Sequence, residues 1–340
     1  MGIATTTRCQ LTLLENNDTK YFAIQGNITL ATSTVQSTVP TFSIVVPTRD
    51  RPLQLATCLA AFSDLNYPTD HFDVIIVDDG SKAPLSEVAA RFQKRLNIRL
   101  LTQSPSGPAT ARNFGASHSQ AEYLAFIDDD CEPDVNWLKN IADMFRLSPD
   151  SGIGGKTNNA LTDNLYSATS QLIIDRIYNY YNDDNSGSAK PLFFTSNNLA
   201  IPRKLFEQMG GFDKSFPIAA AEDREFCNRW IKQGNQFVYA PDATVKHSHW
   251  LSFRKFLRQH FNYGRGSFLF HRITKDSVQK RIRRGTLSLY QQLLQPPPPG
   301  TKNRLTITSL LLASQIATTA GYYREKIQIK KSSARGTILN

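Results

Sequence analysis

Cysteine is scarce in this chain of 340 residues, and its four copies are widely separated. Cys9, Cys58, Cys131 and Cys227 form no pair at the C-x-x-C spacing of redox and zinc motifs. A disulfide-stabilised scaffold is therefore excluded, and we expect reduced thiols. The first residues also lack a charged segment followed by a continuous apolar stretch. No secretory signal is visible, and we expect the active part to face the cytoplasm.

Long apolar runs are missing as well. Residues 305–323 come close to the roughly 20 residues that span a bilayer, but several Thr, Ser and Gln residues interrupt them. Residues 251–340 hold 17 Lys or Arg and two acids, whereas residues 1–250 hold 22 Lys or Arg and 27 acids. A basic amphipathic tail that lies on an anionic membrane is favoured over a spanning helix. The alternative is a helical extension packed on the body, with its charges solvated.

Three other function classes fit the sequence poorly. A nucleotide-dependent oxidoreductase needs G-x-G-x-x-G after its first strand, but residues 47–50 read P-T-R-D. A phosphorelay receiver domain also carries paired aspartates at strand ends, yet it would finish within about one domain length. A nucleic-acid partner is not expected, because the body is net acidic and contains no recognised binding motif.

From residue 41, short apolar runs alternate with helix-length amphipathic segments. Buried strands are predicted at 42–46, 74–77, 98–101 and 123–127, with helices starting near residues 52, 84 and 109 and after 133. Further helices are predicted at 165–181, 222–232 and 252–270, and further strands at 192–200 and 236–239. This alternation predicts an α/β fold in which helices cover both faces of a mainly parallel sheet, followed by a helical C-terminal extension.

Two groups of aspartates follow predicted strands. Asp79 and its neighbour Asp78 end one strand, and Asp128, Asp129 and Asp130 follow another. Ligands of open parallel sheets bind outside the carboxyl ends of the strands. Aspartates there also form turns, and this alternative stays open for the first pair. Three adjacent carboxylates repel one another, and Mg²⁺ or Mn²⁺ would relieve that repulsion.

Two later groups are also candidates. Glu222 and Asp223 open a predicted helix, where acids suit the positive end of the helix dipole, so a purely structural role is an alternative. His247 and His249 follow the strand predicted at 236–239. They are either ligands or ordinary surface histidines.

The order of the motifs resembles that of family-2 glycosyltransferases with the GT-A fold, a bacterial type that makes polysaccharides and glycoconjugates. The resemblance covers about residues 41–270. It rests on FSIVVPTRDR (42–51), VIIVDDGS (74–81), GPATARNFG (107–115), YLAFIDDDCEP (123–133), NNLAIPR (197–203), GGFD (210–213), AEDREF (221–226), His247 and FNYGRG (261–266).

The resemblance implies a nucleotide-sugar donor site. Asp79 would bind the base, with Pro47 and Thr48 forming part of that pocket. Arg112 would lie by the base or the diphosphate. Asn198, with the loop at 210–213, would help to shape the sugar and acceptor side.

It also implies a metal site. Asp128 and Asp130 are the outer members of the DXD motif, with Asp130 the main ligand of Mn²⁺ or Mg²⁺ and Asp129 among the donor contacts. His247 would be a further ligand, although His249 is an alternative. The donor half would lie in residues 41–131 and the acceptor half in 152–250 of a catalytic domain at 41–250. A flexible leader (1–40) and a basic extension (251–340) would flank it.

The resemblance finally implies the chemistry. Asp223 would be the general base that activates an acceptor hydroxyl, with Glu222 as the alternative base. One base opposite the leaving group predicts inversion at the sugar carbon. The acceptor would be a glycan or a lipid-linked glycan. A non-catalytic nucleotide-sugar or polysaccharide-binding relative is the competing interpretation. One departure is Asp50, which stands where the family commonly has Asn.

Overall fold

The computed structural model describes residues 12–16, 19–23, 39–182, 193–216, 220–274 and 288–336. The chain divides into two units, Met1–Thr38 and Val39–Asn340. In the first unit, strands β1 (Thr12–Asn16) and β2 (Thr19–Ala23) form an antiparallel pair. Of the leader predicted at residues 1–40, the structure describes these two strands and residues 39 and 40. The other residues of the leader lie outside the described part of the chain.

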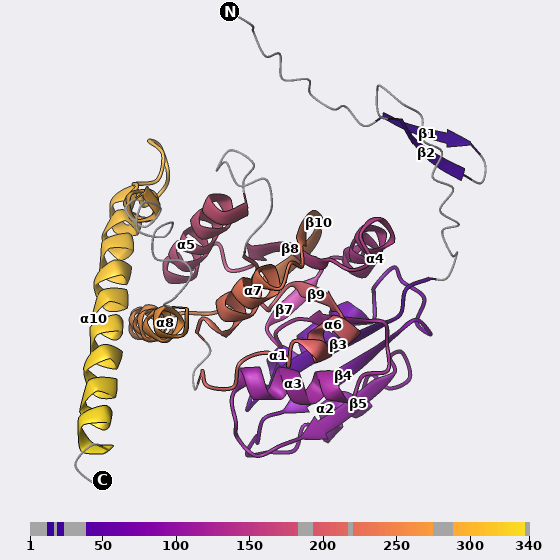
Figure 1. The fold of residues 1–340 in the computed structure, drawn as a ribbon, viewed down its shortest axis with the longest axis horizontal. Helices are drawn as coiled ribbons and strands as arrows, with labels where there is room; N and C mark the ends of the chain where they lie inside the picture. The colour runs from indigo at the N-terminus through magenta and orange to yellow at the C-terminus, as the bar shows by residue number, and fades with distance from the viewer. Residues whose placement is uncertain are drawn as a thin grey trace, which may run out of the picture. The chain divides into compact units, whose positions relative to one another are not determined.

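The second unit is built on an eight-stranded sheet with the order β5-β4-β3-β6-β9-β8-β10-β7. Its first part is parallel and coincides with the four predicted strands (Figure 1). These strands are β3 (Phe42–Thr48), β4 (Phe72–Asp78), β5 (Ile98–Thr102) and β6 (Tyr123–Phe126). Three of them are buried as predicted, whereas β5 lies at the edge of the sheet and is only half-buried. Because the three neighbours β4, β3 and β6 run in one direction, the segments that follow them reach the same edge of the sheet.

The second part of the sheet is mixed. Strand β9 (Leu199–Pro202) is antiparallel to both β6 and β8 (Gly152–Asn159). Strand β10 (Phe237–His247) is parallel to β8 and antiparallel to the short strand β7 (Cys131–Pro133). The predicted α/β fold is thus confirmed, with a mixed sheet of which one half is fully parallel.

Helices cover both faces of this sheet, as predicted. Six of them flank it: α1 (Pro52–Phe62), α2 (Ser86–Ala90), α3 (Pro108–Ser117), α4 (Trp137–Leu147), α6 (Arg203–Gln208) and α7 (Glu222–Lys232). Successive side chains of a strand point to opposite faces. Ile44 accordingly packs in one buried cluster with Phe62 of α1 and Trp137 of α4. Val45, the next residue, packs in another cluster with Trp230 of α7.

The C-terminal extension is helical. It contains α8 (Phe253–Ile273), a short helix at 288–294 and α10 (Arg304–Gly336), and α5 (Leu165–Asn182) packs beside them. Figure 1 shows α10 at the outer edge of this unit, where it crosses α8, which is seen nearly end-on. Within the described part of the chain, no helix has both the length and the hydropathy that crossing a membrane requires.

Glycines allow α8 and α10 to cross in close contact. A Cβ atom on Gly264 would lie 1.8 Å from the carbonyl oxygen of Thr318, and one on Gly321 would lie 1.9 Å from that of Phe261. Both distances are far shorter than any tolerated contact, and backbone atoms cannot move aside as a side chain can. An ion pair of 2.7 Å between Arg265 Nε and Glu325 Oε2 fastens the same crossing.

We expect Gly264→Ala to lower the free energy of unfolding by roughly 1–3 kcal/mol, the usual cost of overpacking. The gain in helix propensity, about 1 kcal/mol, offsets only part of the steric cost. Urea unfolding followed by circular dichroism measures the change. Thr319→Ala, on the exposed side of α10, is the matched control and should stay within about 0.5 kcal/mol of wild type. Equal stability of the Gly264→Ala protein would contradict the close crossing.

Candidate active site

The acidic groups gather where β3, β4 and β6 end. Thr48, the last residue of β3, donates a hydrogen bond from Oγ1 to Oδ2 of Asp129 at 2.7 Å. Arg51 Nη1 lies 2.6 Å from Oδ1 of the same carboxylate. Burial raises the pKa of Asp129 to about 6, although the Arg51 charge opposes this rise. The carboxylates predicted after β6 are therefore fixed at the sheet edge.

Asp130 lies at the centre of a cluster of basic groups. Its Oδ1 is 3.1 Å from His247 Nε2, and its Oδ2 is 3.3 Å from His249 Nδ1 and 3.0 Å from Arg51 Nη1. The antiparallel pairing of β10 with β7 produces this arrangement, because it places His247 opposite Cys131. Burial alone would raise the pKa of Asp130, but hydrogen bonds from the two histidines outweigh it and hold the pKa well below its usual range. Asp130 is therefore an anion at neutral pH.

This cluster has donor atoms that suit a divalent cation. One ligand atom each from Asp130, Cys131 and His247 lies within 4.8 Å of the others. Burial raises the pKa of the Cys131 thiol well above its ordinary value, so the sulfur stays protonated. The carboxylate and the imidazole are thus the groups that fit Mn²⁺ or Mg²⁺. The predicted ligands Asp130 and His247 lie together, and His249 reaches the same carboxylate.

Asp128, the third predicted metal ligand, is not part of this group of donor atoms and forms an ion pair with Arg112. Arg112 is 4% exposed, and its Nη2 is 2.6 Å from Oδ1 of Asp128. Its Nη1 lies 3.3 Å from Oε1 of Glu222, while its buried Nε has no hydrogen-bond partner among the described residues. Arg112 therefore connects the end of β6 with the start of α7, two segments far apart in the sequence.

Glu222 and Asp223 begin α7 and differ in exposure. Glu222 is 4% exposed, whereas Asp223 is only partly buried. Burial raises the pKa of Glu222 to about 7, and the Asp223 charge adds to this rise while Arg112 opposes it. Burial also raises the pKa of Asp223, against the hydrogen bond that its carboxylate accepts from the Arg224 amide. Asp223 is therefore the more exposed member of the pair.

The raised pKa of Glu222 predicts a pH-dependent stability. Its carboxyl ordinarily loses its proton near pH 4.5 but keeps it to about pH 7 in the folded protein. The folded state thus binds more protons in this window, and the free energy of unfolding should fall by roughly 1–3 kcal/mol as the pH rises through it. Urea unfolding at several pH values tests this expectation. Glu222→Gln should reduce the fall, with a remainder from Asp129 and Asp223, whose pKa values burial also raises. Glu87→Gln, at an exposed position of α2, should leave the fall as in wild type. The same fall in both variants would contradict this origin.

The predicted donor-site residues have different surroundings. Asp79 accepts hydrogen bonds from Gln103 Nε2 and the Ser106 amide, both at 2.7 Å, and from the Gly107 amide at 2.9 Å. It therefore holds the loop that leads into α3. Pro47 is half-buried one residue before the end of β3.

Asn198, predicted to shape the sugar and acceptor side, lies in the core. It is 0% exposed, and its Oδ1 accepts a hydrogen bond from Trp137 Nε1 at 2.9 Å. Its Nδ2 donates to the carbonyl oxygens of Ala243 and Lys156 at 2.9 and 3.1 Å. Because all of these partners are internal, Asn198 connects the sheet to α4, and its predicted role beside the sugar stays a prediction. Its position next to Asn197 in the sequence gave no sign of this burial.

Arg51 was missed in the sequence, although it directly precedes the helix that starts at Pro52. Its position depends on Asp50, whose φ of 54° lies in the left-handed region. Asp50 receives a hydrogen bond from the Lys82 amide and donates its own amide to Ser81 Oγ, both at 2.8 Å. Asp and Asn both tolerate this conformation. The departure from the family's usual Asn therefore keeps the turn that directs Arg51 to the aspartates.

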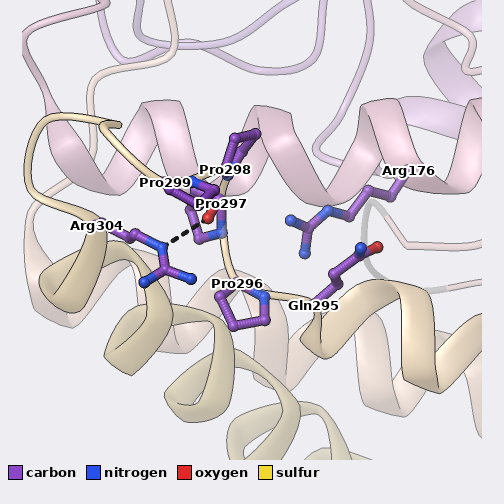
Figure 2. A pocket seen from close by; sticks show the side chains of 7 residues that line it. All are labelled: Arg176, Gln295, Pro296, Pro297, Pro298, Pro299 and Arg304. Atoms are coloured by element: carbon purple, nitrogen blue, oxygen red, sulfur yellow. Dashed lines mark hydrogen bonds between the residues drawn. The ribbon is translucent and has the colours of Figure 1, made fainter.

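A cavity of about 510 Å³ lies away from these groups, in the C-terminal extension (Figure 2). It is lined by Arg176, Gln295, Arg304 and the four prolines at 296–299. Arg304 Nε donates to the carbonyl oxygen of Pro297 at 2.8 Å, and Arg176 Nη1 donates to that of Leu293 at 2.9 Å. None of the predicted site residues lines this cavity, so the acidic cluster is a separate feature.

Comparison with known proteins finds similarity to glycosyltransferases and polysaccharide synthases. A family model described as Glycosyl transferase family 2 matches residues 43–210. The chain is 26% identical over 238 residues to a chondroitin synthase of Escherichia coli. The alignment covers 60% of this chain and 34% of that protein. It is 24% identical over 264 residues to the glycosyltransferase AglE of Haloferax volcanii, covering 77% of this chain and 84% of that protein. The chain thus spans about a third of the length of the chondroitin synthase.

Solved structures share the fold. The mannosyltransferase PcManGT of Pyrobaculum calidifontis, in complex with GDP-Man and Mn²⁺, superimposes with a TM-score of 0.59 at 17% identity, covering 88% of this chain and 81% of that one. S. aureus TarS (residues 1–349), in complex with UDP-GlcNAc, gives a TM-score of 0.50 at 13% identity, covering 86% of this chain and 92% of that one.

Proposed function

We propose, from the premise that this chain belongs to glycosyl transferase family 2 and has the GT-A fold, that it transfers a sugar with inversion. The donor would be a nucleotide-diphosphate sugar and the acceptor a hydroxyl group. The observation that carries the proposal is the position of Arg112, which contacts both Asp128 and Glu222. This arginine brings the acidic edge of the sheet next to the carboxylates of α7, where a leaving group and an acceptor could meet.

The leaving diphosphate develops negative charge as the sugar departs. Asp130 and His247, with Asp128 or His249 as further candidates, would hold a divalent cation, which supplies charge neutralisation when bound. Arg112 would stabilise the negative charge of the diphosphate oxygens with its guanidinium group. We also retain Asp79, Pro47, Thr48 and Asp129 as the base and donor side of the site.

The acceptor hydroxyl is a weak nucleophile at neutral pH, so its proton must leave as the new bond forms. Asp223 would accept this proton, because it is the more exposed of the two α7 carboxylates and burial makes it more basic than a free aspartate. A single displacement with one base inverts the configuration at the sugar carbon. Glu222 would instead hold Arg112 in place.

We further propose the division of the chain and its setting. Residues 41–250 would form the catalytic domain, with donor residues in 41–131 and acceptor residues in 152–250, and residues 251–340 would form the basic extension. A glycan or lipid-linked glycan is the proposed acceptor, since the relatives include a chondroitin synthase. We place the enzyme in the cytoplasm or on the inner face of the membrane, in keeping with the free, buried Cys58, Cys131 and Cys227.

The deciding experiment measures nucleoside-diphosphate release from a panel of nucleotide sugars, with and without Mn²⁺. We expect metal-dependent release from one donor, accelerated by a suitable glycan acceptor, and an inverted anomeric configuration in the product by NMR. Donor binding without release, whichever acceptor is added, would favour a non-catalytic nucleotide-sugar-binding relative. If no donor binds, the interpretation of the acidic cluster is wrong.

A further inference from the structure

Helix α10 has two apolar faces, and only one of them is packed. The packed face contains Ile307, Leu310 and Leu311, all buried against the neighbouring helices. The outer face carries five large apolar side chains, each more than half exposed: Leu305 (81%), Leu312 (51%), Ile316 (71%), Tyr323 (55%) and Ile327 (53%). We call these five residues the outer stripe.

The spacing of the outer stripe keeps it straight along the helix. Its members follow one another at intervals of seven, four, seven and four residues, so the pattern repeats every 11 residues. An 11-residue repeat corresponds to 3.67 residues per turn, close to the helical period, and its members stay on one side of the helix. At 1.5 Å per residue the stripe is about 33 Å long. A regular exposed surface of this length is unusual on an isolated soluble helix.

The exposed charges that α10 and the residues just before it place beside the outer stripe are, among the described side chains, all positive. Lys302 and Arg304 lie at its start, and Arg324, Lys326 and Lys330 lie towards its end. The single acid in the sequence of α10 is Glu325, which is buried and paired with Arg265. No carboxylate of α10 therefore neutralises these cations on the outer side.

We infer that the outer stripe docks on the surface of an anionic lipid bilayer. Its apolar side chains would enter the boundary between head groups and acyl chains, and the lysines and arginines would contact lipid phosphates. Charge disfavours a second copy of this chain as the occupant. Both ends of α10 are basic. Two copies of the helix would therefore place positive charge next to positive charge in a parallel pair and in an antiparallel pair, with no acid to compensate. The inference does not depend on the proposed transfer reaction.

The test uses the full-length chain and sedimentation with phosphatidylcholine vesicles, with and without phosphatidylglycerol. We expect binding to the anionic vesicles that weakens with salt. The double variant Leu312→Glu/Ile316→Glu should lower the partition coefficient by about tenfold or more, because it removes apolar area and adds negative charge. Leu147→Glu, at a residue 63% exposed at the end of α4, is the matched control and should bind as wild type does. Thermal unfolding checks that the variants are folded.

A second variant tests the charges separately. Lys326→Glu/Lys330→Glu keeps all five apolar side chains of the outer stripe, although it removes the contact of Lys326 with the Tyr323 ring. It should also weaken binding to anionic vesicles by about tenfold or more, with a shallower salt dependence. Failure of the wild type to bind anionic vesicles would overturn the inference, as would equal binding by the folded stripe variant and the control. Sedimentation velocity tests whether a second copy of this chain occupies the outer stripe. A wild-type dimer that the stripe variant converts to a monomer, without vesicle binding, would mean that this face joins two copies.

Discussion

Asp223→Asn is expected to reduce the rate of sugar transfer by about 10²–10⁴-fold, the usual contribution of a general base. The amide has nearly the same shape as the carboxylate but cannot accept the hydroxyl proton at neutral pH. Donor binding should stay close to wild type, because the hydrogen bond of the Asp223 carboxylate among the described residues comes from the Arg224 amide and not from the cluster around Asp130. The effect should therefore appear in kcat with acceptor present. Donor affinity, measured by calorimetry, should be almost unchanged.

Two comparisons make this result specific. Asp143→Asn, at a half-exposed position of α4 where the carboxylate pairs with Arg146, makes the same chemical change outside the proposed site and should leave the rate as in wild type. Glu222→Gln should weaken donor binding as well as turnover, because the Glu222 carboxylate is a partner of Arg112. If Asp223→Asn keeps its activity while Glu222→Gln loses turnover alone, then Glu222 is the base.

Asp130→Asn is expected to have the largest effect on metal binding. Loss of an outer partner of a metal ligand already costs about 10–100-fold in affinity, so loss of the central carboxylate should cost more than about 100-fold. The change also leaves His247, His249 and Arg51 facing a neutral amide instead of their shared anion. Titration with Mn²⁺, followed by calorimetry or by the electron paramagnetic resonance of the free ion, measures this directly and without turnover.

The two histidines can be separated in the same experiment. His247→Gln should weaken Mn²⁺ binding more than His249→Gln does, because His247 belongs to the group of donor atoms within 4.8 Å of one another. The reverse order would assign the ligand role to His249. Wild-type affinity in the Asp130→Asn protein would contradict the proposed metal site.

The parallel part of the sheet was predictable because burial on both faces leaves a clear mark in the sequence. The run at 74–77 is continuously apolar, and the strand there, β4, is almost completely buried. The direction of β9 was not predictable, because the composition of four residues does not say which neighbour they pair with. Strand β9 is antiparallel because its register joins β6 to β8. A buried apolar strand can thus be recognised from its own residues, whereas β7 and the glycine-rich β8 were not predicted, and strand direction depends on the whole sheet.

The candidate site divides in the same way. Asp130 and His247 could be proposed from motif order, although 117 positions separate them in the sequence. The contacts of Arg51 with Asp129 and Asp130 could not, because they depend on the left-handed turn at Asp50. Asn198 fits its motif, but its hydrogen bonds reach α4 and β10 and bury it. A motif thus specifies the type of residue, while the tertiary contacts decide what its side chain faces.

The segment that carries Asp223 is supported by a residue beyond the part of the chain that the family model matches. A Cβ atom on Gly266 would lie 2.4 Å from the carbonyl oxygen of Ala220, so α8 presses directly against the residues that lead into α7. Gly266 lies beyond residue 210, where the family match ends. Evolution can therefore adjust the placement of the proposed base through substitutions in α8 and its partner α10. Related chains with the same carboxylates could in this way diverge in the acceptors that they use.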